Sequence, residues 1–201
     1  MTEKDSIADV VGFWREAGPE KWFAKDDAFD AAIRARFGEA TRAALAGGFD
    51  HWRGEAEGAL ALALLLDQFP RNLFRGSALA FSGDARAREI AREALARGFD
   101  LAPEPALRVF PHLPFMHSEE LADQYLMVAL ARWRHDENTL RFAIIHRDII
   151  ARFGRFPHRN AALGRATTQE EAAFLAQPDA FKGGGEGARP SPSSRAQAKR
   201  S

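Results

Sequence analysis

Apolar residues recur along most of the chain at the three- and four-residue spacing of an amphipathic helix. Such stripes predict helices over residues 7–16, 28–37, 85–97, 118–133, 139–153 and 168–175. An Ala/Leu run spans Ala59 to Leu66. We expect a buried central helix over residues 55–68, because the run is rich in strong helix formers and lacks β-branched residues. No segment gives a convincing strand signal, so the pattern predicts an all-α fold.

Signals for helix ends support these boundaries. Asp84 is placed to cap the helix over residues 85–97, and Gly98 to follow its last turn in the left-handed conformation. Thr168 and Glu171 have the spacing of a capping box. The short polar link over residues 135–138 predicts that the helices on either side of it form an antiparallel pair.

An internal repeat is visible at an offset of fifty residues. Residues 39–50 and 89–100 match at eight of twelve positions, and both end in Gly-Phe-Asp. We expect Gly48 and Gly98 to end a helix in the same left-handed way. Two helix-turn-helix units of this size predict a short helical-repeat-like array of antiparallel helix pairs within a single domain.

Length and composition place a domain boundary near the C-terminus. The chain has 201 residues, which corresponds to one domain. Residues 178–201 are rich in Gly, Pro and Ser, and Phe181 is their only large apolar side chain, so we predict a disordered tail after an all-helical domain over residues 1–177. The tail carries a net charge of +3, which leaves −3 on the domain.

Charge and cysteine content narrow the function classes. The 28 basic and 28 acidic side chains cancel, and this balance disfavours a nucleic-acid partner. The chain has no cysteine and no apolar run long enough to span a membrane, and we therefore expect a cytoplasmic protein without disulfides.

The strongest chemical signal is a pair of related segments, Leu66-Asp67-Gln68-Phe69-Pro70-Arg71-Asn72 and Gly154-Arg155-Phe156-Pro157-His158-Arg159-Asn160. In both, we expect an apolar helix to end before a Phe-Pro turn, since the proline ring pushes the preceding residue out of the helical region. Arginine then presents fork-like donors that suit a carboxylate or a phosphate. The predicted ligand-binding residues are Asp67, Arg71, Asn72, His117, Arg155, His158, Arg159 and Asn160.

A structural role explains the same residues equally well. The arginines can form ion pairs that hold Asp67 and Asp123, each of which belongs to an Asp-Gln pair on a helix, and the asparagines can close the turns through their own backbone. The sequence leaves both interpretations open.

A second candidate site involves His117, Asp123 and His146. Two histidines and a carboxylate, brought together across a helix pair, can act as acid and base at neutral pH. The sequence has no HExxH or HxH spacing, so we predict no metal site and no bound cofactor.

A family resemblance rests on the two Phe-Pro segments, on Pro114-Phe115-Met116-His117-Ser118-Glu119, and on the aromatic pairs Phe13-Trp14 and Trp22-Phe23. Through these residues, the chain resembles a bacterial family known as domain of unknown function 924. The resemblance spans roughly residues 7 to 177. It implies an all-helical, tetratricopeptide-like fold, a class that commonly binds peptides or partner proteins, and it implies no particular reaction.

Three functions follow as hypotheses. The first is a helical domain that binds an anionic small molecule or an acidic peptide through the Arg, Asn and His side chains. The second is a small hydrolase-type enzyme that uses His117, Asp123 and His146. The third is a protein–protein assembly module, and the sequence does not give the oligomeric state.

Overall fold

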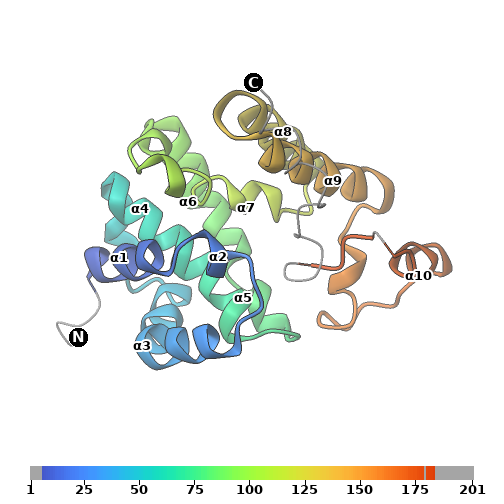
Figure 1. Cartoon of the computed structure of the whole chain (residues 1–201), viewed down its shortest axis with the longest axis horizontal. Coiled ribbons are helices and arrows are strands. Elements are labelled where there is room, and N and C mark those ends of the chain that lie inside the picture. Colours follow the sequence, from blue (N-terminus) through green and yellow to red (C-terminus); the bar gives the residue numbers. More distant parts are fainter. Residues whose placement is uncertain (1–5, 179, 184–201) are drawn as a thin grey trace, which may run out of the picture.

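The chain folds into one all-helical domain, seen in a computed structural model that describes residues 6–178 and 180–183 (Figure 1). No strand occurs among these residues. The α-helices are α1 (Ile7–Ala17), α2 (Pro19–Trp22), α3 (Asp27–Leu45), α4 (Ala56–Ala63), α5 (Phe69–Leu73), α6 (Asp84–Ala96), α7 (Leu113–Met116), α8 (Leu121–Arg134), α9 (Glu137–Phe153) and α10 (Gln169–Leu175). Within the described ranges, no helix combines the length and apolar character that a membrane span requires.

The main core forms around α4, whose residues from Ala59 to Ala63 are buried as the apolar run predicts. Aromatic rings from α1 and α3 pack beside it: Trp14 lies 5.6 Å from Phe69 and Phe37 lies 5.3 Å from the same ring, measured between ring centres. Their contact area drives the packing of the N-terminal half, because burial of large apolar rings is the dominant favourable term.

The central helix does not end at Pro70, which corrects the sequence-based expectation. Residues Leu64–Gln68 form one π-helical turn, in which the Phe69 N–H donates to the Leu64 carbonyl, and the helix then continues as α5. Pro70 therefore sits at the start of a new helical segment, where its missing N–H costs little. The wider turn includes Asp67 and Gln68 at its C-terminal end, and such bulges are frequent at functional sites.

The start of α6 lies directly against this π-turn. A Cβ atom at Gly83 would stand 2.1 Å from the Leu66 carbonyl oxygen, so only glycine allows the approach. Gly83, not Asp84, occupies the N-cap position of α6, which leaves the Asp84 side chain free to contact other groups.

The two Gly-Phe-Asp segments end their helices in slightly different ways. Gly98 adopts the predicted left-handed conformation, with φ of 70°. In the first copy, Gly47 has the positive φ instead of Gly48. The Gly48 N–H donates to the Ala43 carbonyl at 2.8 Å, which is the closing bond of a Schellman motif, and the residue before it must then be left-handed.

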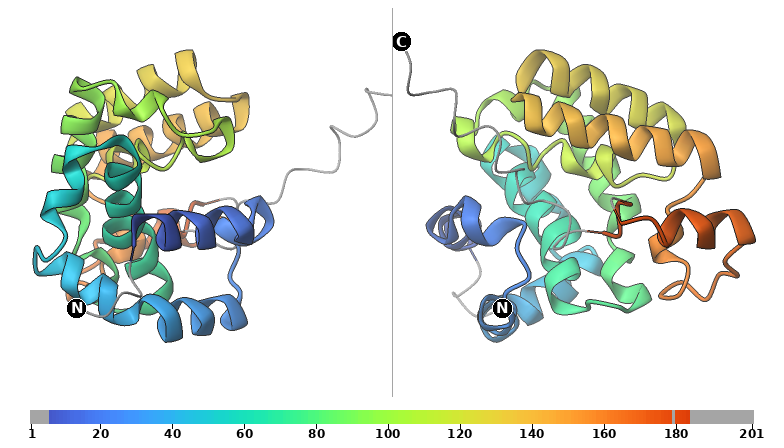
Figure 2. Two further views of the ribbon diagram at one scale, coloured as in Figure 1. Left: turned by 90° about the vertical axis from the view of Figure 1, so that its left-hand side faces the viewer. Right: turned by 45° about the vertical axis from the view of Figure 1, so that its right-hand side comes forward.

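Helices α8 and α9 form the expected antiparallel pair and lie side by side in two orientations (Figures 1 and 2). The predicted capping box of Thr168 and Glu171 starts α10. After α9 the chain builds a second, smaller apolar cluster that includes Ile149, Phe156 and Phe181. Most of the predicted tail, residues 179 and 184–201, lies outside the described residues, and the boundary at residue 177 stays a prediction.

Candidate functional site

A cavity of about 640 Å³ opens where the π-turn, α5 and the segment after α9 meet. We call it the basic cavity. Its lining has five cationic side chains and no acidic one. The cations are Lys25, Arg71, Arg75, Arg159 and Lys182, and the other polar or aromatic side chains are Trp22, Phe23, Gln68, Asn72, Phe81, His117, His158 and Phe181.

Two arginines in the wall of the cavity share one carboxylate. Arg71 Nη1 lies 2.9 Å from Asp84 Oδ1, and Arg159 Nη1 donates to Asp84 Oδ2 at 3.0 Å. These arginines come from the two related Phe-Pro segments, 88 residues apart in number. Asp84 therefore holds both guanidinium groups at the same edge of the cavity.

Arg159, which follows the second Phe-Pro turn, is buried. Its side chain is 7% exposed, and its guanidinium lies 4.5 Å from the Phe81 ring centre and 4.6 Å from that of Phe156. Nη2 donates to the His117 carbonyl at 2.9 Å, while Nε has no hydrogen-bond partner among the described residues. Burial and the neighbouring charge of Arg71 lower the pKa of Arg159 to about 10, so it remains charged at neutral pH.

His117 pairs with Asp67, a partner fifty residues away. Its Nδ1 lies 2.8 Å and 2.9 Å from the two carboxylate oxygens of Asp67. Arg71 contacts the same carboxylate, with Nη1 at 3.1 Å from Oδ1, and Gln68 Nε2 donates to it as well. The fully buried Asp67 is thus held by three side chains.

The protonation states of this pair follow from its surroundings. Burial works to raise the pKa of Asp67, but the charge of Arg71 and the contacts with His117 and Gln68 outweigh it and hold the pKa below its ordinary range. Burial also lowers the pKa of His117 below its ordinary value, and the attraction of Asp67 offsets only part of this effect. At neutral pH the pair is therefore a carboxylate and a neutral imidazole whose Nδ1–H donates to it.

Two further histidines lie near His117. The His146 ring centre is 6.4 Å from that of His117, and its Nδ1 donates to the Phe142 carbonyl at 2.8 Å. His158 lines the basic cavity, and its buried Nδ1 has no partner among the described residues. Burial is the main cause that lowers the pKa of each to about 3, so both imidazoles are neutral at neutral pH.

Asp123 does not join these histidines. Its carboxylate accepts from the Ser118 hydroxyl at 2.7 Å and pairs with Arg88 and Arg92. Asp67 takes the position beside His117 that the sequence-based hypothesis gave to Asp123. In the described part of the chain, no set of three His, Asp or Glu side chains is arranged to hold a metal ion.

Three other predicted residues make contacts within the fold. Asn72 lines the basic cavity and donates to Asp30 at 2.7 Å. Asn160 donates to Glu171 at 3.2 Å, and Arg155 Nε donates to the same carboxylate at 2.6 Å. Arg155 and Asn160 are not among the lining residues of the cavity, so their predicted ligand contact has no support in this geometry.

Several residues of this site carry no clear signal in the sequence. From the sequence, Asp84 has the role of a helix cap, and Gln68 has no role beyond its place next to Asp67. Lys25 and Lys182 stand outside any motif, and Phe181 lies in the predicted tail. Phe181 packs 4.3 Å from His146 and 5.3 Å from His158, measured between ring centres. The signal for Phe181 is its size, because a large aromatic residue within a Gly-rich segment can indicate contact with the folded domain.

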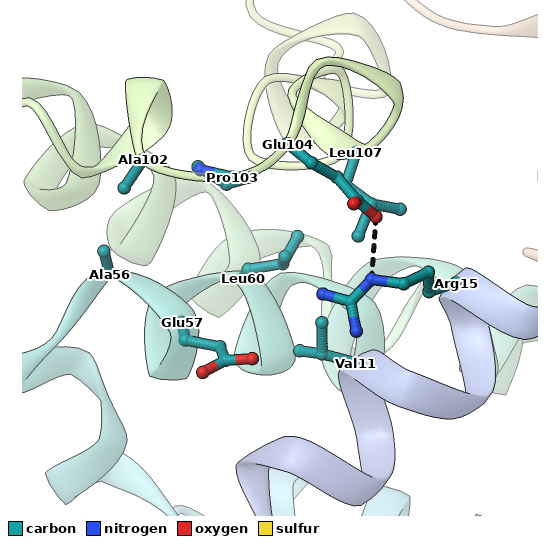
Figure 3. Close-up of a pocket in the computed structure, with 9 residues that line it drawn as sticks. All are labelled: Val11, Arg15, Ala56, Glu57, Leu60, Ala102, Pro103, Glu104 and Leu107. Carbon is teal, nitrogen blue, oxygen red and sulfur yellow. Dashed lines mark hydrogen bonds and ion pairs between the residues drawn. The ribbon is translucent and has the colours of Figure 1, made fainter.

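A second hollow, of about 220 Å³, lies between α1, α4 and residues 102–107 (Figure 3). Its polar groups are Arg15, Glu57 and Glu104, and Arg15 is already paired with Glu104 at 2.7 Å. It contains no histidine and no unpaired cation among its lining residues. The basic cavity is therefore the better candidate for a functional site.

Comparison with known proteins gives the evolutionary context of this geometry. Residues 10–179 match the family described as "Bacterial protein of unknown function (DUF924)". A solved structure, described as "Structure of Protein of Unknown Function ATU0120 from Agrobacterium tumefaciens", is similar with a TM-score of 0.82 and 50% sequence identity, covering 85% of this chain and 96% of that one. No curated protein matches the chain. Because the family match spans most of the sequence, the chain belongs to the bacterial DUF924 family.

Proposed function

We propose that this protein binds a small anionic molecule, bearing a phosphate or a carboxylate, in the basic cavity. The observation that carries the proposal is the lining, with five cations and no acidic side chain. A volume of about 640 Å³ lies within the usual range for small-molecule sites, roughly 300–1,000 Å³, which favours a small molecule over an acidic peptide.

The charge balance supports an anionic ligand. Arg71, Arg75 and Arg159 are paired with the carboxylates of Asp67, Asp84 and Asp30 behind the cavity wall. Lys25 and Lys182 have no ion-pair partner within the part of the chain that the structure describes. Counted over the described residues, the lining therefore has two cations more than the carboxylates that pair with it, and this excess favours an anionic ligand.

The arginine geometry supports the same ligand class. Asp84 and the two aromatic rings fix the guanidinium of Arg159, so little side-chain freedom is lost on binding. Arginine forks suit the paired oxygens of phosphate and carboxylate.

A matched set of lysine variants tests the proposal. Thermal unfolding of the full chain is measured with inorganic phosphate, pyrophosphate and citrate, and affinities are measured by calorimetry. A ligand at a hundred times its Kd adds about 2.7 kcal/mol of stability, which appears as a rise of several degrees in Tm. The double variant Lys25→Gln, Lys182→Gln should weaken binding by about tenfold or more.

Lys21→Gln is the control, because Lys21 lies on α2 next to Phe29 and does not line the cavity. It should bind as the wild type does. The proposal fails if none of the three anions raises Tm, or if the control and the double variant lose affinity equally.

We also propose, as a finer description of the fold, the tetratricopeptide-like arrangement of helix pairs. Its support is the correspondence of the two Gly-Phe-Asp segments, each of which leads from a helix into a 3₁₀ turn, at Asp50–Gly54 and at Phe99–Leu101. A cytoplasmic location is a further proposal.

A further inference from the structure

We propose that His117, positioned by Asp67, is an acid–base catalyst and that the basic cavity hydrolyses a small anionic ester. This inference rests on the proposed anion site, because the cations would hold the ester. The proposed catalytic pair is His117 and Asp67, which are in contact, in place of the predicted set of His117, Asp123 and His146.

The contact with Asp67 determines which nitrogen of His117 is available. Because Nδ1 lies within 2.9 Å of both oxygens of an ionised carboxylate, the proton is on Nδ1 and the lone pair is on Nε2. Among the described residues, no group forms a hydrogen bond with Nε2. This nitrogen is also not fully buried. His117 lines the basic cavity, so the residue that carries this lone pair is in contact with the space that a ligand would occupy.

Asp67 is suited to the role of a positioning residue. It lies in the π-turn, is buried, and accepts from Gln68 as well as from His117. A carboxylate held from several sides fixes the ring orientation and the tautomer of its histidine, and it stabilises the imidazolium that forms when the histidine takes a proton.

The proposed step is a hydrolysis with water as the second reactant. His117 Nε2 takes a proton from a water molecule, and the water oxygen forms a bond to the phosphorus or carbonyl carbon of the bound ester. The bond to the ester oxygen breaks, and that oxygen leaves with the proton that His117 returns. The charge that develops on the attacked group lies beside the guanidinium groups of Arg71 and Arg159, and fixed cations at such a position lower the barrier.

Chemical modification tests the tautomer without knowledge of the substrate. Diethyl pyrocarbonate acylates the unprotonated nitrogen of a neutral imidazole, and peptide mass mapping of the full chain reports each histidine separately. His117 should react faster than His146 and His158, and inorganic phosphate should protect it. Asp67→Asn should slow the reaction by about tenfold, because the amide N–H faces Nδ1 and moves the proton to Nε2.

Turnover is measured with two anionic probes, 4-nitrophenyl phosphate and mono-4-nitrophenyl succinate, which distinguish a phosphate ester from a carboxylate-bearing acyl ester. At least one should be hydrolysed, with kcat/KM nearly constant from pH 7 to 8 and falling in acid. His117→Gln should lose about a hundredfold or more in kcat, as expected for removal of a general base. Asp67→Asn should lower kcat and alter the pH profile, and His51→Gln, on an exposed residue, should change neither.

The outcomes separate this inference from the binding proposal. If pyrophosphate binds but neither ester is hydrolysed, or if His117→Gln hydrolyses as fast as the wild type, the catalytic role is wrong and the anion site stands. If His117 resists acylation while His51 reacts, the available lone pair at Nε2 is also refuted. If anions do not bind at all, both proposals fail.

Discussion

The two Phe-Pro segments share residue types but differ in backbone, and this comparison shows what the motif encodes. In the first, Phe69–Leu73 is a short α-helix that continues a π-turn. In the second, Gly154 follows the last residue of α9 with φ of 67°, and Pro157–Arg159 forms a 3₁₀ turn. The arginines that follow the two prolines nevertheless reach the same carboxylate, Asp84.

The asparagines that follow these arginines donate to other carboxylates. Asn72 donates to Asp30, which Arg75 also contacts, and Asn160 donates to Glu171, which Arg155 contacts. In each segment, the arginine that follows the proline thus reaches Asp84, and the asparagine reaches a different carboxylate that is already paired with another arginine, although Asn72 also lines the basic cavity. Adjacent residues of one motif have different tasks because successive side chains leave the backbone in different directions.

The largest expected effect comes from the buried arginine of the second segment. Arg159→Ala removes the ion pair with Asp84, the bond to the His117 carbonyl and the stacking on two aromatic rings. We expect the free energy of unfolding to fall by about 3 kcal/mol, in the range for breaking a buried charge pair, and pyrophosphate binding to be lost. Urea unfolding at pH 7 measures the first effect and calorimetry the second.

Arg152→Ala is the matched control, since Arg152 pairs with Glu170 and both side chains are about half exposed or more. It should cost less than about 1 kcal/mol. An equally small loss for Arg159→Ala would contradict the structural role of its buried contacts and would remove the difference between the two kinds of arginine.

The asparagines give the next largest effect and sharpen the division of tasks. Asn160→Ala leaves the buried carboxylate of Glu171 with one donor fewer, and we expect a loss of about 1–2 kcal/mol with unchanged pyrophosphate affinity. Asn72→Ala should cost a similar amount through Asp30. If Asn160→Ala weakens pyrophosphate binding more than its loss of stability explains, the asparagine of the second segment belongs to the ligand site after all.

The sequence predicted most of the helices and singled out several residues that line the basic cavity, because both signals are local. Apolar periodicity and caps act within a few residues, so the helices, the capping box at Thr168 and the glycine at position 98 were accessible. The pairing of Asp67 with His117 and the choice of Asp84 as the shared carboxylate were not. Both depend on contacts across tens of residues, and Gly83 makes the second possible by allowing α6 to touch the π-turn.

The π-turn itself shows the same limit. A proline after an apolar helix usually marks its end, and the local rule gave that answer for Pro70. Tertiary packing favours a wider turn instead, because this turn keeps Phe69 fully buried in the aromatic core. The local sequence contains the proline but not the core that makes continuation favourable.

The smallest expected effect concerns the residue that distinguishes the second segment, His158, which stands between Pro157 and Arg159. Its folded-state pKa of about 3 lies below the ordinary value of about 6.5, so between these pH values the unfolded chain binds a proton that the folded chain does not. Stability is therefore unaffected by this group at pH 8 and falls as the pH drops below about 6.5. At pH 6 the loss is about 0.8 kcal/mol relative to pH 8.

His158→Leu should remove this part of the pH dependence in urea unfolding at the two pH values, whereas His51→Leu, on an exposed residue, should not. If the difference between pH 8 and pH 6 is the same in His158→Leu as in the wild type, the imidazole of His158 is not held neutral by its burial, and the second segment contributes only its arginine to the electrostatics of the cavity.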